Sequence, residues 1–108
     1  MKEKFIIIET TYPNLASAKK LGETLLNKKL AACVQFLKVE SSYFWQEKIE
    51  NSREILVRIK SKNSLFFEIE KIIKNCHDYE IPQILSTQIN QGSKAYLNWI
   101  DSNLKNGK

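Results

Sequence analysis

The sequence predicts an α+β domain built on a four-stranded antiparallel sheet, and three observations support this. Residues 5–8 are apolar at every position, as expected of a strand in the middle of a sheet. Residues 33–60 alternate with a period of two over a length that fits one long hairpin. Residues 15–27 and 65–76 instead carry apolar side chains at helical spacing. The length of 108 residues fits a single domain, 1–108.

The first strand and the first helix are separated by a clear break. Tyr12-Pro13-Asn14 ends the strand, and Asn14 is a favourable N-cap for a helix that runs to about Asn27. The apolar positions of this helix are Leu15, Ala18, Leu21, Leu25 and Leu26. Gly22 lies inside it, and we expect close packing against the sheet at that point.

The hairpin is predicted to project beyond the body of the domain. Its first strand begins with both faces apolar and ends with one polar face. One parity carries Cys33, Leu37, Val39 and Tyr43, and the other carries Val34, Phe36, Lys38 and Glu40. Trp45-Gln46-Glu47 forms the turn, and the return strand carries Ile49, Ile55, Val57 and Ile59 on one parity. We expect Cys33 to be a core residue, because free cysteine is among the most buried residue types.

The second half of the chain repeats the alternation of helix and strand. Asn63-Ser64 offers an N-cap for a helix whose apolar face is Leu65, Phe66, Ile69, Ile72, Ile73 and Cys76. A polar loop over 77–82 leads to a short strand over 84–89. Gly92-Ser93 starts a last helix. This order is the ferredoxin-like βαββαβ arrangement plus a C-terminal helix, with both main helices on one face of the sheet.

The other face of the sheet points to self-association. A sheet covered on one side only should alternate apolar and polar residues, yet residues 5–8 and 33–39 carry apolar side chains on both parities. We therefore expect a homo-oligomer that closes over the second face.

Composition excludes several classes of protein. The net charge is +5, but the lysines are dispersed and form no basic stripe, so we expect no nucleic-acid partner. Two cysteines make no disulfide framework, and no segment resembles a secretory signal or is long enough to span a bilayer. The sequence therefore predicts a cytoplasmic protein with reduced thiols and no membrane partner.

Several motifs in order resemble the CutA family, the divalent-cation tolerance proteins, over nearly the whole chain. They are Thr10-Thr11-Tyr12-Pro13, Lys29-Leu30-Ala31-Ala32-Cys33-Val34, Tyr43-Phe44-Trp45, Ile59-Lys60-Ser61, His77 with Tyr79-Glu80 and Pro82, and Ala95-Tyr96-Leu97-Asn98-Trp99. The resemblance implies a PII-like homotrimer with paired hairpins, and a role in tolerance of copper and other divalent metals. The chain departs from the family pattern at Asp78 and Gln83, and at Glu47 the family's turn glycine is lost.

The resemblance places a candidate metal site at Cys76 and His77. A thiolate and an imidazole suit copper or zinc, with the soft thiolate favouring Cu(I). A complete site needs further ligands, from Asp78, Glu80 or a neighbouring subunit. The favoured alternative is that Cys76 is a small core residue and His77 caps the helix C-terminus. No cofactor is obligatory on either interpretation.

A second candidate site is a pocket at the subunit junctions of the implied trimer. Its residues are Tyr43, Trp45, Lys60, Tyr79, Glu80, Tyr96 and Trp99. They form either a polar and aromatic pocket for a small ligand or, as we favour, trimer packing with an ion pair between Lys60 and Glu80.

No catalytic residue is predicted, and we expect no enzyme. The glycines form no phosphate-binding loop, and the single histidine lies in no triad motif. The preferred function is a metal-ion response through binding of copper or another divalent cation. The alternative is a PII-like regulatory module that binds a small ligand or a partner protein, with no metal role. A nucleic-acid-binding ferredoxin-like domain is disfavoured, because the aromatic ribonucleoprotein motif is absent.

Overall fold

The structure is a computed structural model that describes residues 4–107. The order of elements agrees with the prediction. They are β1 (Phe5–Tyr12), α1 (Leu15–Asn27), β2 (Cys33–Trp45), β3 (Lys48–Lys62), a 3-10 turn (Asn63–Leu65), α2 (Phe66–Asn75), β4 (Leu85–Gln88) and α3 (Lys94–Ser102). Residues 1–3 lie outside the described residues. They belong to the N-terminal segment that was predicted to hold no secretory signal. Within residues 4–107 no helix is long and apolar enough to cross a membrane.

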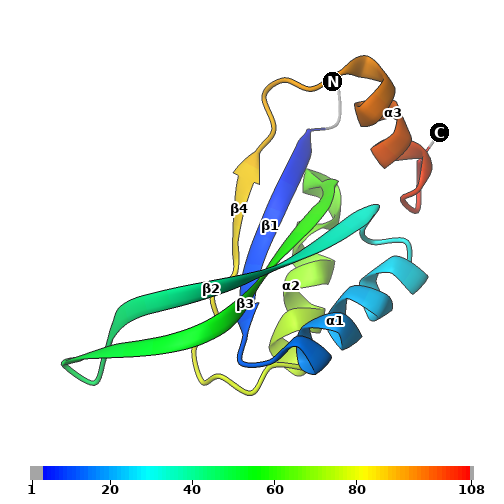
Figure 1. Ribbon diagram of the computed structural model, residues 1–108. Coiled ribbons are helices and arrows are strands. Elements are labelled where there is room, and N and C mark those ends of the chain that lie inside the picture. Colours follow the sequence, from blue (N-terminus) through cyan, green and yellow to red (C-terminus); the bar gives the residue numbers. More distant parts are fainter. Residues whose placement is uncertain (1–3, 108) are drawn as a thin grey trace.

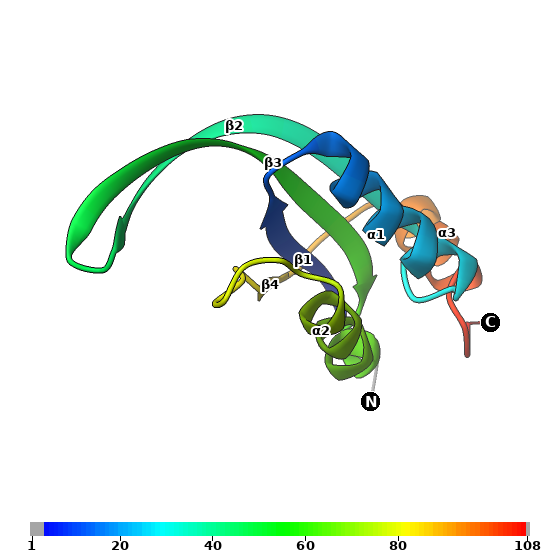
Figure 2. The same ribbon diagram turned by 90° about the horizontal axis from the view of Figure 1, so that it is seen from below.

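The four strands form one antiparallel sheet in the order β2-β3-β1-β4 (Figure 1). Helices α1 and α2 lie on the same face of this sheet (Figure 2). The α+β ferredoxin-like prediction is therefore confirmed for the single chain.

The hydrophobic core lies between the sheet and these two helices. Alternate residues of β1 and β3 point toward the helices, which is why Ile6, Ile8, Val57 and Ile59 are all buried. From the helices, the buried residues are Ala18, Leu21, Leu25, Ile69 and Ile73. Ile100 of α3 and Leu104, just beyond it, also belong to the core, and a backbone hydrogen bond from Lys105 to Lys29 ties this end of the chain to the segment after α1.

Three local features form as the sequence predicts. The Asn14 side chain caps α1 by accepting a hydrogen bond from the Ser17 amide at 2.8 Å. Ser93 caps α3 in the same way through the Tyr96 amide. Gly22 lies against the sheet, where an added Cβ would stand 2.8 Å from Cζ of Phe36. That close approach explains a glycine inside the helix.

The β2–β3 hairpin is unusually long and curved. Its strands have 13 and 15 residues, against about five or six in an ordinary strand. It projects from the body, and the chain measures 46 × 26 × 22 Å (Figure 2). The turn residues Gln46 and Glu47 have φ of 52° and 66°, a backbone that favours glycine or asparagine. The turn geometry is thus kept although the glycine is lost.

The helix-free face of the sheet is largely open in the single chain. Ile7 and Cys33 on this face are only half-buried, and the Leu37 side chain is 43% exposed. The expectation that Cys33 is a core residue is therefore wrong in the single chain. Its strand parity was right, but that parity faces away from α1 and α2.

Candidate functional site

The loop between α2 and β4 begins at Cys76, one residue after the helix ends. Cys76 is the C-cap of α2, with φ −115° and ψ 7°, so its side chain leaves the buried stripe formed by Ile69 and Ile73. Its thiol is exposed rather than part of the core. The interpretation of Cys76 as a core residue is wrong, because the helical periodicity stops just before it.

His77 joins this loop to the end of β1. Its Nε2 donates a hydrogen bond to the carbonyl oxygen of Thr11 at 2.6 Å, and its Nδ1 accepts one from the amide of Tyr79 at 3.1 Å. Both bonds are satisfied by a single neutral tautomer that carries its proton on Nε2. His77 therefore does not cap α2, whose end is closed by a backbone bond from Cys76 to Ile73.

Two tyrosine rings hold the imidazole in place. The ring of Tyr12 stacks on His77 with 4.3 Å between centroids, and the ring of Tyr79 lies 4.7 Å away. Burial, with smaller contributions from Cys76 and Asp78, raises the pKa of Tyr12 to about 12. The Tyr12 phenol is therefore neutral at physiological pH.

The donor atoms of one chain do not assemble a complete metal site. In the part of the chain that the structure describes, no three His, Cys, Asp or Glu side chains lie close enough to hold one metal ion. Cys76 and His77 supply at most two donors, and both His77 nitrogens already have backbone partners. A tetrahedral site would need donors from another chain or from solvent.

A concavity of about 860 Å³ opens between the curved hairpin and the loop that starts at Cys76. Its walls are partly aromatic, from Tyr43, Phe44, Trp45 and Tyr79. They are also acidic, from Glu54, Asp78 and Glu80. Gln83, where the family pattern has an acid, lines it as well. Such a mixed lining is typical of a small-ligand site.

One hydrogen bond joins the two walls of this concavity. The Tyr79 hydroxyl donates to Oε2 of Glu54 at 3.0 Å. Burial raises the pKa of Tyr79 well above that of an ordinary tyrosine, and the bond to the Glu54 carboxylate raises it further. The phenol therefore stays protonated and fixes the loop to β3.

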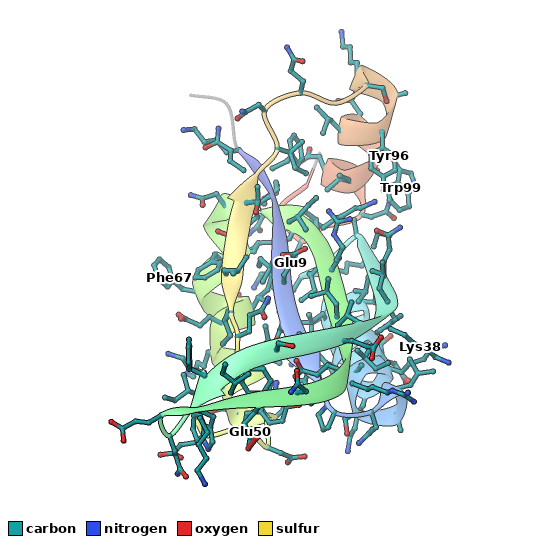
Figure 3. The ribbon with its side chains drawn as sticks, turned by 60° about the vertical axis from the view of Figure 1, so that its left-hand side comes forward. Glu9, Lys38, Glu50, Phe67, Tyr96 and Trp99 are labelled. Atoms are coloured by element: carbon teal, nitrogen blue, oxygen red, sulfur yellow. The ribbon has the colours of Figure 1, made fainter. Side chains whose placement is uncertain are left out.

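Within the single chain, three of the seven residues assigned to the junction pocket lie away from this concavity. Lys60, Tyr96 and Trp99 gather at α3, and Figure 3 shows the two aromatic residues at the end of the molecule opposite Glu50 on the hairpin. The Lys60 ammonium donates to the Tyr96 hydroxyl at 3.0 Å, and the rings of Tyr96 and Trp99 stack at 5.5 Å. Within residues 4–107 Lys60 and Glu80 form no ion pair, so the predicted pair at a subunit junction would have to join two chains and stays a prediction. Tyr43, Trp45, Tyr79 and Glu80 do come together around the concavity.

Sequence reasoning missed two residues of this site. Glu54 was placed on the polar parity of β3, but its side chain is only 8% exposed. Thr11 contributes a carbonyl oxygen, which no side-chain pattern can reveal. In the sequence Glu54 follows the polar run Asn51-Ser52-Arg53 in the middle of β3, so nothing marks it as buried.

Known proteins resemble this chain over nearly its whole length. A family model described as "CutA1 divalent ion tolerance protein" matches residues 6–103. The divalent-cation tolerance protein CutA of Archaeoglobus fulgidus is 36% identical over 98 residues, covering 91% of this chain and 96% of that protein. The chloroplastic protein CutA of Arabidopsis thaliana is 33% identical over 102 residues. That match covers 94% of this chain but only 56% of the plant protein.

The fold is also shared with solved structures. The structure of the periplasmic divalent cation tolerance protein CutA from Archaeoglobus fulgidus matches with a TM-score of 0.89 at 35% identity. The match covers 92% of this chain and 97% of the archaeal chain.

Proposed function

Because the chain belongs to the CutA1 divalent ion tolerance protein family, we propose that it acts in metal-ion tolerance by binding copper or another divalent cation as a homotrimer. The observation that carries this proposal is the exposed Cys76 thiol, which directly precedes His77. A cysteine sulfur is a soft ligand that suits copper, and its exposure leaves it free to bind a metal ion from solution.

His77 is the second donor of this proposal. Of its two hydrogen bonds, the one at Nδ1 is the longer, and it comes from a main-chain amide that solvent can satisfy instead. Binding through Nδ1 would leave the bond from Nε2 to Thr11 intact. The remaining ligands would come from a neighbouring subunit or from water, since residues 4–107 of one chain bring no third His, Cys, Asp or Glu donor to this site.

The assembly is proposed on the helix-free face of the sheet. Ile7, Cys33 and Leu37 leave apolar surface open there, and the hairpin exposes Phe44 and Ile49 near its tip. Burying such surface between copies is the ordinary way to stabilise a homo-oligomer. A cytoplasmic location is part of the same proposal, and it differs from the locations named for the Arabidopsis and Archaeoglobus proteins.

Copper titration of reduced protein followed by native mass spectrometry tests the metal proposal. We expect Cys76→Ser to weaken copper binding about tenfold or more, and His77→Ala to weaken it several-fold. Cys33→Ala is the matched control, because it removes the other thiol away from the loop while keeping a small apolar side chain on the helix-free face, and it should leave copper binding unchanged. Equal affinity in the Cys76→Ser variant would contradict the proposal.

A second candidate function is a regulatory module that binds a small ligand, with no metal role. The concavity beneath the hairpin favours it, because aromatic and acidic side chains from β2, β3 and the loop line one space. Saturable ligand binding in the presence of a chelator would support this function.

A further inference from the structure

We propose that the concavity beneath the hairpin binds an organic ammonium ion, with the Glu54 carboxylate as its counter-ion. This inference rests on the second function proposed above and names the chemical class of its ligand. It starts from a buried acid that forms no ion pair with any residue the structure describes.

Glu54 is the buried acid. Its side chain is 8% exposed, and its hydrogen-bonding partner is a phenol, the Tyr79 hydroxyl on Oε2. Within residues 4–107 no lysine, arginine or histidine forms an ion pair with it. Lys62 offers the contrast, since it is buried to a similar degree and is paired with Asp101 at 2.8 Å. Buried charges in proteins are normally paired, so the Glu54 site lacks a positive partner.

The surroundings of Glu54 favour a cation. Asp78 and Glu80 line the same space, and no basic side chain of the described residues does. The concavity is therefore negative although the chain as a whole carries a net charge of +5. Four aromatic side chains also line it, beside neutral polar residues and Ile81, and aromatic ring faces attract ammonium groups.

The spacing of the acids favours an organic cation over a metal ion. Calcium or magnesium needs several oxygen ligands at about 2.0–2.6 Å from one point. No three acidic, histidine or cysteine side chains of the described residues converge in that way. The acids are instead spread around a space of about 860 Å³, which suits an amine with a carbon chain.

Two sources could supply this ammonium group. One is a free amine, and the other is a lysine of a second copy of this chain. Both would place a primary or secondary ammonium against Glu54 and the aromatic wall.

Isothermal titration of the full chain with spermidine and with 1,5-diaminopentane, in the presence of EDTA, tests the free-amine source. We expect saturable binding that Glu54→Gln weakens about tenfold or more, because a charge-assisted bond is lost. Glutamine still accepts the Tyr79 hydrogen bond, so the fold should be kept. Glu50→Gln on the same strand is the matched control, since Glu50 does not line the concavity, and it should bind like the parent protein.

Fluorescence of Trp45 gives an independent reading of the same site. In a Trp99→Phe background Trp45 is the remaining tryptophan, and amine binding should change its emission. Trp45→Leu should weaken amine binding several-fold by removing part of the aromatic wall.

Sedimentation of the same variants tests the second source. If a lysine of a second copy fills the site, free amines give no heat and Glu54→Gln weakens self-association about tenfold or more, while Glu50→Gln does not. Amine binding that is equal in Glu54→Gln and Glu50→Gln would overturn the proposal. So would the absence of amine binding together with unchanged self-association in Glu54→Gln. Copper uptake at Cys76 is measured separately, so failure of either proposal leaves the other standing.

Discussion

Tyr12 and Tyr79 flank the same imidazole, but their hydroxyl groups are in opposite states. The Tyr12 hydroxyl is buried and has no hydrogen-bond partner among residues 4–107. The Tyr79 hydroxyl donates to Glu54 across the concavity. A buried polar atom without a hydrogen-bond partner destabilises the folded state, whereas a hydrogen bond to a carboxylate stabilises it.

We expect Tyr12→Phe and Tyr79→Phe to have opposite effects on the free energy of unfolding. Tyr12→Phe keeps the stacked ring, removes the unpaired hydroxyl and should stabilise the protein by about 1 kcal/mol. Tyr79→Phe leaves the buried carboxylate of Glu54 without its hydrogen-bond donor and should destabilise the protein by about 1–3 kcal/mol. Urea denaturation at pH 7 measures both, and a stability loss in Tyr12→Phe would show that its hydroxyl is satisfied in solution.

The stability of the parent protein and of Tyr12→Phe should also differ in its dependence on alkaline pH. The pKa of Tyr12 is raised from 10.0 to about 12 in the folded chain, so the neutral phenol is favoured by folding. The stability linked to this shift is fully present below pH 10 and is lost as the pH rises toward 12. The Tyr12→Phe variant should lack that part of the decline.

At the scale of elements, the β2–β3 turn has a backbone conformation that its two residues do not favour. Gln46 and Glu47 both have positive φ, which costs a residue with a Cβ roughly 1 kcal/mol or more. Asn-Gly is the preferred pair for a two-residue turn of this kind. The long ladder between β2 and β3 holds the turn in place despite this cost.

The double variant Gln46→Asn, Glu47→Gly should therefore stabilise the projecting half of the hairpin. We expect the free energy of local opening near Tyr43 and Glu50 to rise by about 1–2 kcal/mol, measured by hydrogen exchange of their amides. Glu50→Gly serves as the control, because Glu50 lies inside β3 and a glycine there should lower the same free energy. Unchanged protection in the double variant would mean that the turn does not limit opening.

At the scale of the whole molecule, two exposed apolar side chains can be used to locate the interface between copies of the chain. Leu37 is 43% exposed on the helix-free face, and Phe67 is 78% exposed on α2, where it points away from the molecule (Figure 3). If copies pack over the helix-free face, a charge at Leu37 would be buried without a partner.

We expect Leu37→Glu to shift the assembly toward monomers by at least about tenfold in its dissociation constant. Phe67→Glu places the same charge at a more exposed position on the other side of the sheet and should leave the assembly unchanged. Analytical ultracentrifugation measures both variants. The reverse pattern would place the interface on α2.

Cys76 shows that helical periodicity predicts burial within a helix but not at the residue where the helix ends. Its spacing from Ile69, Ile72 and Ile73 predicted a buried thiol, yet α2 ends one residue earlier and the cap geometry turns the side chain outward. Helix ends are set by capping contacts that the apolar pattern does not contain.

By itself the sequence determined the order of the elements, the strand parities, the caps at Asn14 and Ser93, and the close packing at Gly22. These depend on contacts between near neighbours and on periodic burial, which the chain carries locally. The tertiary structure alone decided that Glu54 is buried under Tyr79, that His77 bonds to Thr11, and that Lys60 lies with Tyr96 and not with Glu80. Those contacts join residues far apart in the chain, and their partners are chosen by sheet order and hairpin curvature, which no local pattern specifies.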